Sequence, residues 1–341
     1  MKIGISYWGF CESFESSKEA KTPDGHRYGR PIMVDTLIDR GHDVYALQQQ
    51  REATPYPGLK YDDGFPDLDI LFVEWRWKTY KNSGPDKFEP DLDRQFALLS
   101  KYHGKIPVVI WDCDYKVSHV DEMMWPEAII TDPAFEPRNL TRKRERLMFW
   151  TDWKKLMPVN STSFEYGYVG NNYERPQAFE RYYSLPSAGL RSLGIQTTVH
   201  GNWLEVSPER ESPKSLIQSH SNVAFAPRLN FYDSMKRLNS FICTTHITKP
   251  EYAQRGFASP RYVENIVSNV PALVPEEFLI PSLLGSRWTV NGSGSVVEKV
   301  SLISSMNLED RTELILEQEN NLKSSGVFSI NSVVDFLESL K

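Results

Sequence analysis

The sequence predicts an α/β protein of two domains, each built around a mainly parallel β-sheet. Short apolar runs alternate with segments of helical periodicity along most of the chain, which is the pattern of repeated β/α units. The runs at 69–75 (DILFVEW) and 106–112 (IPVVIWD) are continuously apolar, as expected of parallel strands that are covered on both faces. A length of 341 residues exceeds what one hydrophobic core usually supports, so two domains are expected.

The first half of the chain opens as a doubly wound sheet. We expect a strand at 2–7, a helix at 32–44 that ends near Gly41, and a further strand directly after it. A helix at 91–103 and a strand at 128–133 complete this half. The order β-loop-α-β is typical of Rossmann-like domains.

The second half repeats this alternation. We expect a strand and turn at 164–172, a helix at 177–194 and a strand at 195–202, with further alternations as far as 278 and a charged helical tail at 309–341. A second Rossmann-like domain therefore follows the first.

We expect the chain to divide into three segments. Residues 1–158 form an N-terminal Rossmann-like domain, and residues 159–310 form a C-terminal Rossmann-like domain. The helices at 311–341 are expected to return to the N-terminal domain.

Composition excludes several classes of protein. The net charge of −6 argues against a uniformly basic surface for nucleic acid, although a local basic patch stays compatible with it. Three scattered cysteines, Cys11, Cys113 and Cys243, provide neither a disulfide framework nor a zinc site, and we expect no dedicated metal site. The absence of a signal-like start or a long apolar run predicts a cytoplasmic protein with no membrane segment. We expect a monomer.

Two aspartates follow the predicted strand at 106–112. Asp112 and Asp114 stand at its carboxyl end, where ligand groups collect in open α/β sheets. Such a pair can clamp a metal ion on a diphosphate, or one carboxylate can act as a general base toward a hydroxyl. The alternative is an aspartate that caps the following turn.

A glycine-containing turn precedes the predicted helix at 177–194. Gly170, Asn171 and Asn172 open this turn, whose backbone N–H groups can face a phosphate, and Arg175 adds guanidinium donors. Alternatively, Gly170 simply suits the geometry of the turn.

The segment Pro-Arg-Tyr-Val-Glu is a third candidate. Arg261 and Glu264 are three residues apart at a helix start, so they share one face and can bind the phosphate and the ribose of a nucleotide. A surface ion pair is the alternative. Lys249, upstream, and Gly201 and Asn202, which follow a strand end, are assigned to the same nucleotide site.

Basic and aromatic residues mix at 138–155. Within this segment we assign nucleic-acid contacts to five side chains, because cations suit phosphates and aromatic rings stack on bases. These are Arg142, Lys143, Arg144, Arg146 and Trp150. A solvated amphipathic helix between the domains is the alternative.

Several of these segments together resemble one family, the DNA β-glucosyltransferases of T-even bacteriophages. They are the opening Met-Lys-Ile-Gly-Ile, the strand 105–112 followed by Cys-Asp-Tyr-Lys, and the short runs Tyr-Val-Gly-Asn, His-Gly-Asn, Arg-Tyr-Val-Glu-Asn and Pro-Glu-Glu-Phe. Each run is short, but their order and spacing match the family across most of the chain.

The resemblance implies a GT-B fold, in which two Rossmann-like domains face a central cleft, and a UDP-sugar donor in the C-terminal domain. It also implies inverting transfer to a hydroxymethylated pyrimidine of double-stranded DNA, in the host cytoplasm if a phage encodes the protein. Asp112 matches the family's catalytic aspartate, with Asp114 as the second choice, and Arg261 and Glu264 match its phosphate and ribose contacts. The arginine expected soon after Gly170 is displaced here to Arg175. Mg²⁺ or Mn²⁺ can assist the diphosphate without a dedicated cage.

Two alternatives stay open at this point. A GT-B glycosyltransferase for a polysaccharide, lipid or small-molecule acceptor agrees better with the acidic composition. A non-catalytic nucleotide- or DNA-binding protein on the same fold is the other, because a fold does not fix a function.

Overall fold

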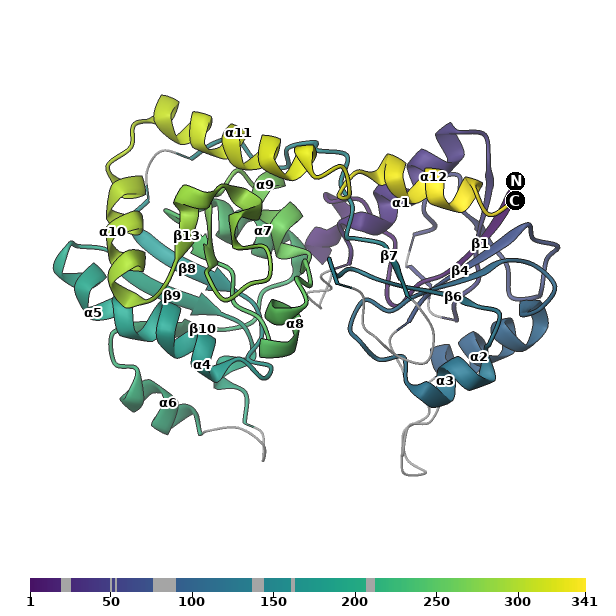
Figure 1. Ribbon diagram of the computed structural model, residues 1–341, viewed down its shortest axis with the longest axis horizontal. Coiled ribbons are helices and arrows are strands. Elements are labelled where there is room, and N and C mark those ends of the chain that lie inside the picture. Colours follow the sequence, from purple (N-terminus) through teal and green to yellow (C-terminus); the bar gives the residue numbers. More distant parts are fainter. Residues whose placement is uncertain are drawn as a thin grey trace. The chain divides into compact units, whose positions relative to one another are not determined.

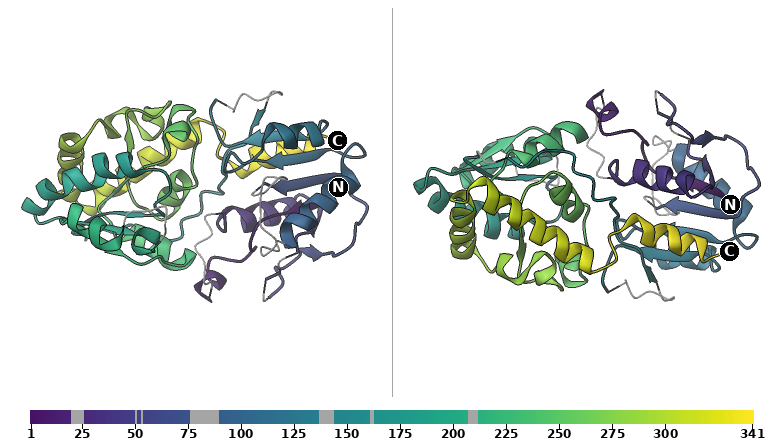
Figure 2. Two further views of the ribbon diagram at one scale, coloured as in Figure 1. Left: turned by 90° about the horizontal axis from the view of Figure 1, so that it is seen from below. Right: turned by 90° about the horizontal axis from the view of Figure 1, so that it is seen from above.

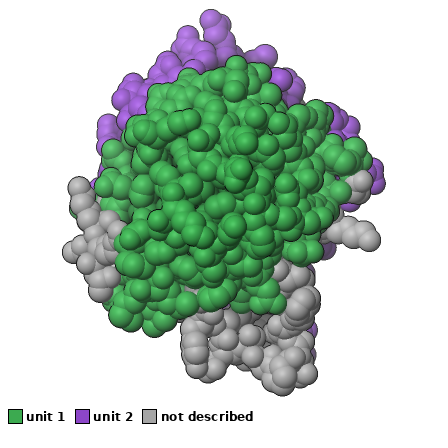
Figure 3. Space-filling model, turned by 90° about the vertical axis from the view of Figure 1, so that its right-hand side faces the viewer, with its two compact units in different colours: residues 1–13, 26–152, 327–341 green, residues 14–25, 153–326 purple. Residues whose placement is uncertain are grey.

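The computed structural model describes residues 1–19, 26–49, 51–52, 54–75, 90–136, 144–160, 163–206 and 212–341. The chain forms two compact units, which Figure 3 shows in different colours. Unit 1 comprises residues 1–13, 26–152 and 327–341, and unit 2 comprises residues 14–25 and 153–326.

Unit 1 contains a seven-stranded parallel sheet in the order β3-β2-β1-β4-β5-β6-β7. Its strands are β1 (Lys2–Ser6), β2 (Asp43–Ala46), β3 (Lys60–Tyr61), β4 (Ile70–Glu74), β5 (Val108–Trp111), β6 (Ile129–Asp132) and β7 (Glu145–Arg146). The central strands β4 and β5 are buried along their whole length, as their continuous apolar runs predict. The strand order reverses between β1 and β4, which is the Rossmann arrangement.

Helices cover both faces of this sheet. One face carries α1 (Gly29–Asp39) and α12 (Ile330–Glu338), and the other carries α2 (Pro90–Tyr102) and α3 (His119–Met124) (Figure 1). Arg40 on the α1 C-cap lies 2.6 Å from Asp335 and 2.9 Å from Glu338 of α12. The two chain ends therefore lie side by side in unit 1 (Figure 2).

Unit 2 contains two three-stranded parallel ladders, β10-β9-β8 and β11-β12-β13. The strands are β8 (Glu165–Val169), β9 (Gln196–His200), β10 (Val223–Ala226), β11 (Thr244–Thr245), β12 (Ala272–Pro275) and β13 (Thr289–Val290). Backbone bonds from Ile242 to Glu165 and from Gly167 to Cys243 join β8 to the β11 segment. The six strands thus follow the order β10-β9-β8-β11-β12-β13, which reverses between β8 and β11.

The helices of unit 2 connect and cover these strands. They are α4 (Pro176–Phe179), a π-helical turn (Glu180–Ser184), α5 (Leu185–Ser192), α6 (Pro213–Ser219), α7 (Phe231–Asn239), α8 (Pro250–Gln254), α9 (Arg261–Val267), α10 (Ser293–Ser304) and α11 (Leu308–Ser324). Short 3₁₀ turns lie at Ser16–Glu19, Asn202–Leu204, Pro281–Leu284 and Ser286–Trp288. A large apolar core under the sheet includes Tyr166, Trp203 and Trp288.

The unit boundaries nearest the predicted ones lie at 152 and 326, whereas the sequence-based boundaries lie at 158 and 310. Residues 14–25, which the prediction places in the N-terminal domain, belong to unit 2. Helix α11 belongs to unit 2 because Gln318 accepts from the Ala272 N–H and donates to the Ala272 carbonyl. Within the described part of the chain, no helix is long and apolar enough to cross a membrane.

Candidate functional site

A pocket of about 410 Å³ opens in unit 2 between the α4 start, α8 and the segment after β12. Its wall includes Arg175, Gln177, Arg181, Thr248, Glu277 and Phe278. A narrower pocket shares Thr248 and Phe278 with it and runs along the ends of β8 and β11 to Arg261. Both pockets lie where the strand order of the sheet reverses, which is where open α/β sheets bind their ligands.

Most cations of this region have a carboxylate partner. Lys249 lies 2.9 Å from Glu174, and Arg181 lies 3.3 Å from Glu276. Arg261 pairs with Glu264, whose side chain is wholly buried. These cations are therefore neutralised before any ligand binds.

Arg175 differs from these cations. Its Nη1 donates to the Tyr168 hydroxyl at 2.6 Å and to the Ile247 carbonyl at 3.3 Å, and its Nε donates to the Tyr173 carbonyl at 3.0 Å. All three acceptors are neutral, and no carboxylate of the described residues forms an ion pair with Arg175. A fixed guanidinium with an uncompensated charge suits an anionic ligand such as a phosphate.

The helix start at Arg261 stands beside a buried neutral histidine. Burial, and then the Arg261 charge, lower the pKa of His246 to about 3. Asn265 donates to His246 Nε2 at 3.0 Å and to the Thr244 hydroxyl at 2.8 Å. The histidine is therefore uncharged at neutral pH and helps fix α9 against β11.

The turns after β8 and β9 brace each other. The Asn172 N–H donates to the Asn202 side chain at 2.7 Å, and the Asn202 N–H donates to the Asn171 side chain at 3.2 Å. A Cβ on Gly201, whose φ is 150°, would lie 2.2 Å from the Gly170 carbonyl oxygen. The structure thus brings these predicted residues together, as a rigid pair of turns.

One part of the prediction for this turn is wrong. The Gly170 N–H donates to the His200 carbonyl at 2.9 Å, and the Asn172 N–H is used by Asn202. These backbone groups were expected to face a phosphate. Both N–H groups instead donate to acceptors at the end of β9 and in the turn after it. This pairing avoids the free-energy cost of a buried N–H without a partner.

The carboxyl end of β5 in unit 1 carries Asp112, which has no exposed surface. Its carboxylate accepts from Arg144 at 2.5 Å and from the N–H groups of Lys116 and Val117 at 2.5 and 3.2 Å. Burial raises the pKa of the Asp112 carboxyl, although Arg144 and both N–H groups oppose the shift. Asp112 therefore fixes the turn 113–117, on which Asp114 is partly exposed.

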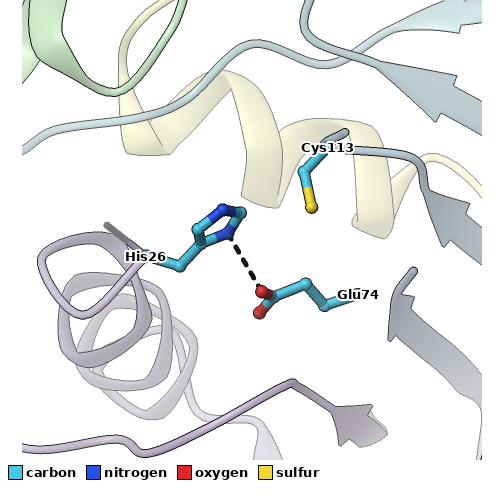
Figure 4. A group of neighbouring side chains, drawn as sticks. All are labelled: His26, Glu74 and Cys113. Atoms are coloured by element: carbon cyan, nitrogen blue, oxygen red, sulfur yellow. Dashed lines mark ion pairs between the residues drawn. The ribbon is translucent and has the colours of Figure 1, made fainter. Parts of the chain in front are cut away.

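A second buried group lies at the ends of β4 and β5. Glu74 accepts from Arg30 Nε at 3.0 Å and Nη2 at 2.8 Å. His26 Nδ1 lies 3.0 Å from the same carboxylate, as Figure 4 shows. Burial alone would raise the pKa of Glu74, but Arg30 and then His26 lower it below its ordinary value. Cys113 completes a group with metal-ligand spacing, but both oxygens of Glu74 are already engaged by Arg30.

The five predicted nucleic-acid contacts differ in whether the structure describes them and in their exposure. Arg142 and Lys143 lie outside the described residues. Arg144 and Trp150 are buried, at 2 % and 4 % exposure, so their assignment to a DNA surface is wrong: Arg144 neutralises Asp112, and the Trp150 indole donates to the Gly29 carbonyl. Arg146 is exposed and lies over the Phe135 ring.

Sequence reasoning missed Tyr168, Glu277 and the Arg30–Glu74 pair. The run Glu-Tyr-Gly-Tyr-Val gave a signal for Tyr168, since alternate residues of a strand share a face and Tyr168 is the last but one residue of β8. The Arg30–Glu74 pair joins residues 44 positions apart, which no local pattern displays.

The fold and the pocket at its strand reversal define the class: this is a GT-B fold, as predicted. Particular solved structures cover this chain along almost its whole length. T4 phage β-glucosyltransferase in complex with UDP and Mn²⁺ has a TM-score of 0.68 and 14 % identity, covering 100 % of this chain and 99 % of that one. The same phage enzyme as a mutant with UDP-glucose has a TM-score of 0.66, 14 % identity and 100 % coverage of both chains.

Two further structures show the breadth of the similarity. An α-glucosyltransferase with UDP and a 13-mer DNA containing an HMU base has a TM-score of 0.61 and 14 % identity, with 99 % of both chains covered. WaaG, a glycosyltransferase involved in lipopolysaccharide biosynthesis, has a TM-score of 0.51 and 12 % identity, with 98 % of both chains covered. No protein-family model and no curated protein matches the sequence. The resemblance to the phage enzymes therefore holds at the level of the fold.

Proposed function

We propose that this protein is a glycosyltransferase that takes a sugar from a nucleoside diphosphate, with UDP as the expected carrier. The observation that carries the proposal is the uncompensated guanidinium of Arg175 in a pocket at the strand reversal of unit 2. The GT-B fold supports it, and so do the similar phage structures, whose ligands are UDP and UDP-glucose.

The proposed acceptor is a hydroxyl on a modified pyrimidine of double-stranded DNA. The similar α-glucosyltransferase bound to DNA with an HMU base supports this choice. An acceptor in a polysaccharide, a lipid or a small molecule is the second candidate, favoured by the net charge of −6 and by the similarity to WaaG.

The proposed reaction is a single displacement with inversion. The acceptor oxygen forms a bond to the anomeric carbon while a carboxylate accepts its proton, and the diphosphate departs with the electron pair of the broken bond. Because Asp112 is committed to Arg144, we assign the proton to Asp114 and give Asp112 the positioning of its turn. A positive φ of 54° at Tyr115 indicates that this turn is held in an uncommon conformation.

The departing diphosphate gains its stabilisation from cations of unit 2. Arg175 is preset for it, and Arg261 becomes available if the ligand exchanges with Glu264. Electrostatic stabilisation of developing charge is usually the main source of rate enhancement in such transfers. Lys249 joins them only if its pair with Glu174 opens.

A divalent ion is a further expected helper, and the T4 structure contains Mn²⁺ together with UDP. The carboxylates on the pocket wall do not form a metal cage, because Glu174 pairs with Lys249 and Glu277 with Arg181 and the Tyr182 hydroxyl. No step of the proposed reaction therefore depends on a metal held by these residues.

The test measures transfer of labelled sugar from UDP-sugars to hydroxymethylcytosine DNA. Wild type should transfer label, Asp114→Asn should lose about 100-fold or more in kcat while binding UDP normally, and Arg175→Ala should bind UDP weakly. Retained UDP binding with transfer only to other acceptors would select the second candidate. Binding without transfer to any acceptor would indicate a non-catalytic protein, and absence of UDP binding would refute the proposal.

A further inference from the structure

Tyr168 connects the glycine turn to the uncompensated cation of the pocket. Its side chain is almost completely buried beside Trp203 and Tyr183, with ring centroids 6.4 and 5.5 Å away. Its hydroxyl stands 2.6 Å from Arg175 Nη1. A rigid ring thus holds the guanidinium at the end of a flexible arginine side chain.

We propose that Tyr168 is a positioning residue that presets Arg175 for the diphosphate of the donor. The inference rests on the proposed function and extends it to a residue that does not itself need to touch the ligand. Tyr168 would determine how tightly the phosphates bind, and not how the nucleoside binds.

The hydrogen bonds of Arg175 support this role. Its Nε and Nη1 hydrogens are used by Tyr173, Tyr168 and Ile247, and Nη2 has no partner among the described residues. A guanidinium carries five N–H donors, so the two on Nη2 remain for phosphate oxygens. The side chain is therefore ordered before binding, which reduces the entropy that a long side chain loses when it binds.

The neutrality of the partners matters as much as their geometry. A carboxylate in place of the Tyr168 hydroxyl would also order Arg175, but it would cancel the charge that attracts phosphate, as Glu174 does for Lys249. A phenol holds the side chain and leaves its charge uncompensated.

Gly170 also serves this arrangement. A Cβ at Gly170 would lie 2.5 Å from the Tyr168 hydroxyl oxygen, and the Gly170 N–H is already used by His200. The missing side chain therefore makes room for the tyrosine, and the N–H is not the group that meets a phosphate.

The first experiment compares Tyr168→Phe with wild type by calorimetric binding of UDP and of uridine. We expect UDP to bind about tenfold more weakly, the loss expected for one hydrogen bond to a charged group. Uridine should bind within twofold of wild type. Tyr232→Phe, at a ring on α7 that contacts Phe14 and lines neither pocket, is the control for loss of a phenol hydroxyl.

A double-mutant cycle separates positioning from general packing. If Tyr168 acts through Arg175, Tyr168→Phe should cost nothing further in an Arg175→Ala background. Gly170→Ala, which pushes on the same hydroxyl, should reproduce the selective loss of UDP affinity. Equal losses for UDP and uridine, or multiplicative losses in the cycle, would overturn the inference while leaving the proposed function intact; a wild type that does not bind UDP would refute both.

Discussion

The carboxyl edges of the two sheets share one topology and differ in their charge balance. In unit 1 the acidic groups at this edge are buried with cations, as Asp112 is with Arg144 and Glu74 is with Arg30. In unit 2 the edge opens into a pocket where Arg175 keeps an uncompensated charge. Removal of one partner from a buried ion pair destabilises its unit, whereas an uncompensated cation gains a partner only when an anionic ligand binds.

The largest effect is expected from breaking the buried ion pairs of Arg144 in unit 1. Arg144→Ala leaves the carboxylates of Asp112 and Asp132, both fully buried, without the cation that lies 2.5 and 3.5 Å from them. Loss of one partner of a buried ion pair costs about 3–5 kcal/mol. Urea unfolding should therefore shift strongly for Arg144→Ala and little for Arg146→Ala, whose side chain is exposed. Equal urea midpoints for the two variants would show that Arg144 does not stabilise the buried carboxylates.

A second prediction concerns acid stability in unit 2. The pKa of His246 is lowered to about 3 in the folded protein, while an unfolded histidine titrates near 6.5. The unfolded state therefore takes up a proton first as the pH falls, and His246 removes about 1.4 kcal/mol of stability per pH unit between 6.5 and 3. Glu74 in unit 1 reduces the stability only below the ordinary glutamate pKa of about 4.3, because its pKa is lowered in the folded protein.

The variant His246→Gln should remove the uptake of one proton on unfolding, and with it this part of the pH dependence. Between pH 6.5 and 4 its free energy of unfolding should fall by about 3 kcal/mol less than that of wild type. A slope that His246→Gln leaves unchanged would show that the ring is not held neutral.

The third prediction compares two cations of unit 2. Arg175→Ala should weaken UDP binding about 30-fold, since it removes a charge that no carboxylate of the described residues cancels. Lys249→Ala should cost less than about threefold, because Glu174 already neutralises the ammonium. Calorimetry with UDP measures both, and similar losses would show that pairing in the free protein does not determine which cation binds the phosphates.

The sequence predicted the α/β class and the central strands, because β4 and β5 are continuous apolar runs. It could not predict β3, β7 or β13, since strands of two residues carry no periodicity. The membership of α11 in unit 2 depends on Gln318 reaching Ala272, 46 residues away. Side-chain contacts over such separations leave no local pattern.

The same limit explains the site predictions. The structure places residues 170–175, 201–202 and 261–264 near one sheet edge, where they were expected, because strand ends and helix starts can be located from local pattern. Their partners could not be located: Arg144 looks like part of a basic surface in sequence, and only the fold puts it against Asp112, 32 residues earlier. The sequence therefore shows which side chains are charged, but their burial in the fold determines whether they bind a ligand or pair with another side chain.

The smallest effect is expected at Arg146, an exposed cation of unit 1. If DNA is the acceptor, Arg146 can meet a phosphate, whereas Arg144 and Trp150 are buried and cannot. Arg146→Ala should weaken binding to duplex DNA by less than about threefold near physiological salt and reduce the slope of log K against log salt by about 0.9, the value for one phosphate contact. Trp150→Phe should leave that slope unchanged, since the indole donates inward to Gly29. An unchanged slope for Arg146→Ala would place the DNA contacts elsewhere on the protein, and a wild type with no salt-dependent DNA binding would favour an acceptor other than DNA.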